Sequence, residues 1–150
     1  MSIKVKLSFY EKINQELDYK IPQNGSIIKL TAGICFKTKN DWTDPYFGIV
    51  DTGAHISVIP RRIWSKSEVK VFAEHSMRGV VPLKECTVPV LVGEIQAKLI
   101  DSEENSTRKF TMPSYFALTN KIPLLIGFKK VIECFELYCN YPKKEAYVVG

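Results

Sequence analysis

The stretch FGIVDTGAHISVIP, residues 47–60, holds the most distinctive pattern in the chain. Asp51 follows directly on an apolar, strand-like run and is itself followed by Thr52 and Gly53. Gly53 permits close backbone approach, and its N–H can hold an oxygen of the carboxylate. A carboxylate fixed at the end of a rigid strand is well placed for acid–base chemistry. The structural alternative is an Asx turn, in which Asp51 only caps its own turn between two strands.

The composition around this stretch is that of one ordinary globular domain. The chain has 150 residues, 45% apolar and 25% charged, so we expect a single domain over residues 1–150. No apolar run approaches the ~18 residues of a membrane span, and charges interrupt the N-terminal apolar residues, so we expect a cytoplasmic protein without membrane contact. The net charge is +5, but Lys and Arg are scattered, which favours a solvated basic surface over nucleic-acid binding.

Short apolar or alternating runs separated by turn signals predict an all-β domain. We expect a small closed β-barrel with one or two short helices. The runs predict strands over residues 3–9, 27–36, 46–50, 70–72, 87–92, 94–100, 110–118 and 146–149. Short helices are expected over residues 60–64, where Pro60 stands at a possible first helical position, and over residues 128–135.

The cysteines and histidines offer little for metal or nucleophilic chemistry. The chain has four cysteines, no CxxC pair and two histidines, so we expect no metal and no cofactor. We expect buried free thiols in a reducing compartment, with two disulfides as the alternative, for Cys35, Cys86, Cys134 and Cys139. His55 is interpreted as an ordinary polar position beside the loop, with substrate contact or pH modulation as the alternative.

Two motifs carry a resemblance to a known family. Asp51-Thr52-Gly53-Ala54 in an apolar strand, followed by Ser57-Val-Ile-Pro60, resembles the catalytic loop of retropepsin-like aspartic proteases. Downstream, Ile122-Pro-Leu124-Leu125-Ile126-Gly127 resembles the apolar segment that packs beside that loop. The resemblance covers about residues 46–138, and it implies a barrel of the acid-protease type.

A third segment lies between these two motifs. Met77-Arg78-Gly79-Val80-Val81-Pro82 stands where the flap hairpin of the family would lie. The resemblance therefore makes Met77, Arg78, Gly79 and Val80 candidates for a flap over the substrate. The segment is short and has one glycine, which distinguishes it from the flap of the family.

The resemblance also implies an activity and an assembly. The chain has a single Asp-Thr-Gly, so a complete site needs a homodimer in which each copy gives one Asp51. The expected function is an aspartic endopeptidase that hydrolyses peptide or protein substrates with a water activated between the two carboxylates. By the same resemblance, Thr52 would hydrogen-bond across the two-fold axis and hold the two loops rigid.

Departures from the family pattern leave alternatives open. Lys129 stands where relatives often carry Asp or Asn, which keeps open a non-catalytic retropepsin-fold module for dimerisation or peptide binding. A basic nucleic-acid-binding barrel is a weaker third reading. Residues 1–25 exceed the minimal unit and are interpreted as an N-terminal extension, an interface strand or a self-cleaved leader. Residues 146–149 are expected to be a free edge that pairs with a second chain, or else to close their own barrel.

Overall fold

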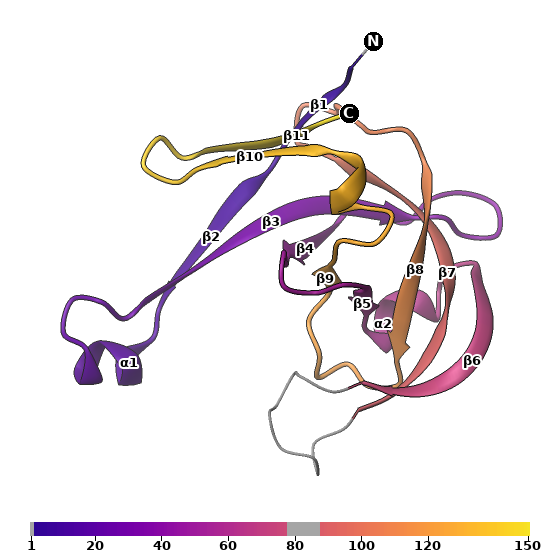
Figure 1. The fold of residues 1–150 in the computed structure, drawn as a ribbon, viewed down its shortest axis with the longest axis horizontal. Helices are drawn as coiled ribbons and strands as arrows, with labels where there is room; N and C mark the ends of the chain where they lie inside the picture. Colours follow the sequence, from indigo (N-terminus) through magenta and orange to yellow (C-terminus); the bar gives the residue numbers. More distant parts are fainter. Residues whose placement is uncertain (1, 78–87) are drawn as a thin grey trace.

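The computed structural model describes residues 2–77 and 88–150 (Figure 1). Most of the described chain lies in strands, which confirms the all-β prediction. In chain order the elements are β1 (Lys4–Lys6), β2 (Ser8–Ile13), α1 (Gln15–Lys20), β3 (Ser26–Phe36), β4 (Tyr46–Val50), β5 (Ser57–Ile59), α2 (Arg61–Trp64), β6 (Val69–Met77), β7 (Val88–Ile100), β8 (Phe110–Ala117), β9 (Leu125–Ile126), a 3₁₀ helix (Ile132–Cys134), β10 (Glu136–Asn140) and β11 (Glu145–Val149).

The larger of the two sheets closes on itself. Its strand order is β2-β3-β4-β9-β5-β8-β7-β6, and β3 also pairs with β7. The strands from β3 through β4, β9, β5 and β8 to β7 therefore form a closed ring, while β2 and β6 extend from it. The pairs β4–β9 and β5–β8 are parallel, and the other pairs of this sheet are antiparallel. The smaller sheet has the order β1-β11-β10.

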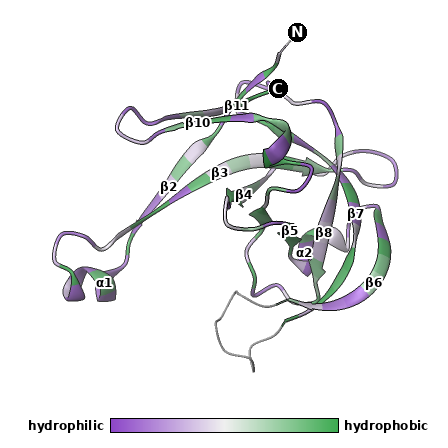
Figure 2. Ribbon diagram, viewed as in Figure 1, coloured by the Kyte–Doolittle hydropathy of each residue, from purple (hydrophilic) through white to green (hydrophobic). Residues whose placement is uncertain are grey.

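The core fills the inside of the ring and the space between the two sheets. Alternation along β7 directs Ile95, Ala97 and Leu99 inward. Phe36 and Phe116, both fully buried, are the largest side chains of this cluster. Hydrophobic segments accordingly recur along the strands of the ring, as Figure 2 shows. Burial of these side chains is what holds the strands at fixed positions beneath the site described below.

The helix prediction is correct at one place and wrong at the other. Helix α2 begins after Pro60 and buries Ile63. The predicted helix over residues 128–135 is instead a series of turns and the short 3₁₀ helix, because Lys130 adopts a left-handed backbone with φ of 60°. Among the described residues, no helix is long and apolar enough to cross a membrane.

Helix α1 was not among the predicted elements. Its six residues include none that is buried, so no apolar periodicity marks it in the sequence. The side chain of Asn14 caps it by accepting a hydrogen bond from the N–H of Leu17, at 3.0 Å. An exposed ion pair between Lys20 and Glu16 follows the helix surface.

The expected free edge at residues 146–149 is wrong. Strand β11 is the central strand of the smaller sheet, with β1 on one side and β10 on the other. The reason is a non-local pairing, in which Val5 of β1 lies opposite Val148. The apolar C-terminal strand is therefore paired on both sides within its own chain.

The three described cysteines are free thiols, as expected, and the expected burial holds for one of them. Cys35 is buried, and burial raises the pKa of its thiol. Cys134 and Cys139 are exposed, which corrects the expectation that they are buried. Cys86 lies outside the described residues.

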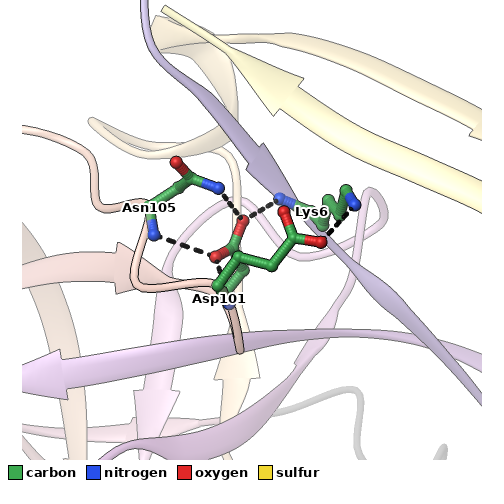
Figure 3. Close-up of polar contacts among 4 residues, drawn as sticks. Lys6, Asp101 and Asn105 are labelled. Carbon is green, nitrogen blue, oxygen red and sulfur yellow. Dashed lines mark hydrogen bonds and ion pairs between the residues drawn. The ribbon is translucent and has the colours of Figure 1, made fainter.

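An aspartate loop fastens the smaller sheet to the larger one (Figure 3). Asp101 follows β7, and its carboxylate accepts the backbone N–H of Lys6 in β1 at 3.0 Å. It also accepts the N–H groups of Glu103 and Asn105 and the side-chain amide of Asn105, at 2.9–3.1 Å. Desolvation alone raises the pKa of Asp101, but these four hydrogen bonds outweigh it, and the net pKa is lowered.

Candidate active site

Strand β4 delivers Asp51 to the edge of the ring. The strand ends at Val50, and the backbone N–H of Asp51 donates to the carbonyl of Ile126 at 2.9 Å. Gly53 then turns the chain so that its N–H donates to Oδ1 of Asp51, also at 2.9 Å. Oδ2 of Asp51 accepts no hydrogen bond from the residues that the structure describes. The carboxylate is thus fixed through one oxygen and open at the other.

The downstream apolar segment lies between the two strands that flank this loop. Strand β9 runs parallel to β4 and pairs with β5 through Val58 and Leu125. Directly after it, the N–H of Gly127 donates to the buried hydroxyl of Ser57 at 2.9 Å. The N–H of Phe128 donates to the carbonyl of Ala54, again at 2.9 Å. The loop and the strand that follows it are therefore held by hydrogen bonds from backbone N–H groups that lie far from them in the sequence.

Gly127 occupies a position that only glycine fits. A Cβ atom at this residue would lie 2.7 Å from the carbonyl carbon of Ile56 and 2.8 Å from the carbonyl oxygen of Ala54. Both neighbours are backbone atoms, so neither moves without displacing the loop. The glycine of the second motif therefore serves the close approach of the two segments.

A cavity of about 740 Å³ opens beside the Asp51 carboxylate. That volume is within the range of pockets that hold a ligand or a short peptide segment. Apolar and polar side chains both line it, from four separate parts of the chain. The lining residues are Asp51, Gly53, Ala54, His55, Ile56, Val58, His75, Ser76, Met77, Tyr115 and Leu125.

One wall of this cavity is a cluster of three rings. Nε2 of His55 lies 3.3 Å from the hydroxyl of Tyr115, and the ring of His75 stacks on the ring of Tyr115 with centroids 5.7 Å apart. The sequence indicates an ordinary polar position for His55, and no pattern in it marks Tyr115. No pattern in the sequence predicts this cluster, because its residues come from distant parts of the chain. The pairing of β5 with β8, and of β6 and β8 with β7, brings them together.

The remaining predicted residues divide between the loop and the flap. Thr52 and Gly53 are exposed in the loop, and the Thr52 hydroxyl makes no hydrogen bond within the described residues. Met77 is the last residue of β6, is buried and lines the cavity. The other flap candidates, Arg78, Gly79 and Val80, lie outside the described residues. Over the described ranges, no three His, Cys, Asp or Glu side chains group as metal ligands do.

Comparisons with known proteins show a likeness to solved structures alone. No family model matches the chain, and no curated protein matches it significantly. Among solved structures, it is similar to a retropepsin-like aspartic protease from Rickettsia conorii. The TM-score is 0.48 and the sequence identity 10%, over 99% of this chain and 95% of that one. The function is accordingly inferred from the site itself.

Proposed function

We propose that the protein is an aspartic endopeptidase that acts as a homodimer, with Asp51 of each copy as a catalytic residue. One observation carries the proposal: the carboxylate stands at the end of strand β4 of the closed ring, held through Oδ1 by Gly53, beside a cavity of about 740 Å³. Positioned carboxylates of this kind are general acids and bases. The apolar side chains of Val58 and Leu125 in the cavity wall suit the side chains of a bound peptide.

A single Asp51 provides one of the two carboxylates that this chemistry needs. Two carboxylates about 3 Å apart cannot both ionise, so they share one proton. The ionised group takes a proton from a water molecule, whose oxygen attacks the carbonyl carbon of the scissile peptide bond. The protonated group gives its proton to the carbonyl oxygen. The tetrahedral intermediate then collapses: the carboxyl group that took the proton from water gives it to the leaving nitrogen as the C–N bond breaks, and the other carboxylate takes a proton back from a hydroxyl of the intermediate.

The second carboxylate must come from a second copy. The chain has one Asp-Thr-Gly, and no other described Asp or Glu lines the cavity. In a two-fold dimer, the same loop of each copy meets at the axis. The free Oδ2 of Asp51 and the exposed Thr52 hydroxyl are groups that such a partner loop can contact.

The test is peptide hydrolysis by the wild-type protein and by Asp51→Asn, assayed on a diverse peptide mixture by mass spectrometry from pH 4 to pH 8. We expect cleavage by the wild type, with a bell-shaped pH profile on the acidic side of neutrality, and inhibition by a statine peptide. Asp51→Asn should keep the fold and lose at least roughly a thousandfold in rate. Undiminished cleavage by Asp51→Asn contradicts the proposal.

One observation favours a second candidate, a peptide-binding module without turnover. The segment after Gly127 forms turns interrupted at Lys130 in place of the expected helix. Such a module would bind a peptide in the same cavity and leave it intact. The assay above separates the two functions, because the module predicts statine binding by calorimetry together with no cleavage at any pH.

A further inference from the structure

A long arm projects from the body of the molecule. We define the arm as residues 8–30, which comprise β2, α1 and the outer part of β3, and Figure 1 shows α1 at its tip. Its base is anchored: Phe9 packs edge-on against Tyr141, and Glu11 pairs with Lys144 at 3.0 Å. Beyond Glu11 the arm extends away from the ring as a two-stranded ribbon.

The arm overruns the edge at which Asp51 stands. The last antiparallel pair between β3 and β4 is Thr31 with Ile49. From that pair, β4 runs on to Asp51. Because the two strands are antiparallel, the part of β3 that precedes Thr31, back to Ser26, extends the same way in space. Five residues of strand at ~3.3 Å each carry β3 about 17 Å past its last contact with β4. Whatever contacts the Asp51 loop from outside therefore also lies beside the arm.

Apolar side chains on the arm are exposed to an unusual extent. Phe9 and Leu30, which pair across the strands, pack against the core, and the same face continues outward to Ile28 and Ile13. The exposed large apolar residues of the arm are Tyr10 (51%), Ile13 (68%), Tyr19 (88%), Ile21 (49%) and Ile28 (44%). Ile13 and Ile28 lie on the face of Phe9, whereas Tyr10, which pairs with Lys29, lies on the opposite face of the ribbon.

The backbone of the arm is also incomplete. On one side, residues 26–30 of β3 pair with β2. On the other side, which is the side of β4, no described strand pairs with them. An isolated two-stranded ribbon is marginally stable in water, and an open strand edge is a template for pairing with another chain. Both features indicate that another surface covers the arm.

We propose that the arm binds a second copy of this chain and clasps it beside the Asp51 loop. The inference rests on the proposed function, because a copy that brings a second Asp51 must dock at the edge the arm overruns. In a two-fold dimer each arm then lies on the other copy. The exposed isoleucines and tyrosines of each arm are then available for contact with the other copy.

The test is the double variant Ile13→Lys/Tyr19→Lys, examined by sedimentation equilibrium and by the peptide assay. Both side chains are exposed in the single chain, so the substitution leaves the fold intact, as circular dichroism will check. We expect the dimer dissociation constant to rise roughly a hundredfold, about tenfold for each lost anchor. Phe47→Lys is the matched control: Phe47 is 73% exposed on β4 outside the arm, and its replacement should leave dimerisation unchanged.

The outcomes separate this inference from the proposed function. Weaker association in the arm variant supports the arm interface, even if the wild type cleaves no peptide and the enzymatic proposal fails. A dimer and an activity unchanged by the arm variant overturn the arm interface and leave the proposed function intact. A wild-type protein that stays monomeric at several hundred micromolar overturns the arm interface outright.

Discussion

Asp51 and Asp101 occupy equivalent places in the sheet and have opposite surroundings. Each follows the last residue of a long-range paired strand and begins a tight turn. Asp101 accepts four hydrogen bonds that occupy both of its oxygens, whereas Asp51 accepts one from the described residues, on Oδ1. A carboxylate whose two oxygens both accept hydrogen bonds has a structural role. Within residues 2–77 and 88–150, Oδ2 of Asp51 accepts no hydrogen bond and lies beside a cavity, which is the state that a reacting group needs.

The first and largest test of this contrast exchanges both carboxylates for amides. Asp51→Asn should abolish peptide hydrolysis while its melting temperature stays within error of the wild type. Asp101→Asn should keep its activity within about twofold and lower the melting temperature, because it disturbs only the junction of the sheets. Calorimetry and the peptide assay on both variants check this. Loss of activity in Asp101→Asn with an unchanged melting temperature would contradict the division of roles.

The second test concerns the hydrogen bonds, other than those to the Asp51 carboxylate, that hold this part of the chain in position. Ser57→Ala removes the acceptor of the Gly127 N–H, so the free energy of unfolding should fall by about 1–3 kcal/mol. Ser114 is the matched control, since it is equally buried, pairs with Ser57 in the sheet, and its hydroxyl has no described hydrogen-bond partner. Ser114→Ala should be neutral or stabilising in urea denaturation. Equal losses for the two variants would contradict a specific fastening by Ser57.

The third test uses acid. Because the folded-state pKa of Asp101 is lowered, its contribution to stability is present above the unfolded value of about 3.9 and is lost as pH falls through the folded value. The wild type should exceed Asp101→Asn by about 1–2 kcal/mol at pH 7, discounted for partial exposure. The difference should vanish at the lowest pH at which both still fold. A difference that does not change with pH would show that hydrogen-bond geometry, not charge, fastens the sheets.

The smallest effect belongs to the ion pair beside Asp101. Lys6 and Glu103 lie 2.7 Å apart with side chains 56% exposed, and the hydrogen bond to Glu103 raises the pKa of Lys6. Exposed pairs of this kind contribute little because water and salt screen them. Glu103→Gln should therefore leave the urea midpoint within error. A clear loss of stability would place part of the fastening in this pair.

The features that could be predicted from the sequence are those that a local pattern of residues determines. The strand that ends at Asp51 and the turn at Gly53 could be placed because apolar runs and glycine act over a few residues. The approach of Gly127 to this loop was expected through the family resemblance, and its steric reason is visible only in three dimensions.

Features that depend on distant pairing could not be predicted. The ring of Tyr115 reaches the cavity only because β8 pairs with β5 and β7. The free edge expected at residues 146–149 is filled by β1 from the other end of the chain. Helix α1 buries no residue, and the helix expected over residues 128–135 does not form, because Lys130 is left-handed. Periodicity contains none of this information.

The central claim is that two Asp51 carboxylates, one from each copy, make a single site. Its most direct test mixes wild-type and Asp51→Asn chains at fixed total concentration, lets the subunits exchange, and measures the rate of peptide hydrolysis. If both copies are needed, the rate follows the square of the wild-type fraction, so an equal mixture shows about a quarter of the wild-type rate. A rate proportional to the wild-type fraction, about half in that mixture, would mean that each chain acts alone and would contradict the account.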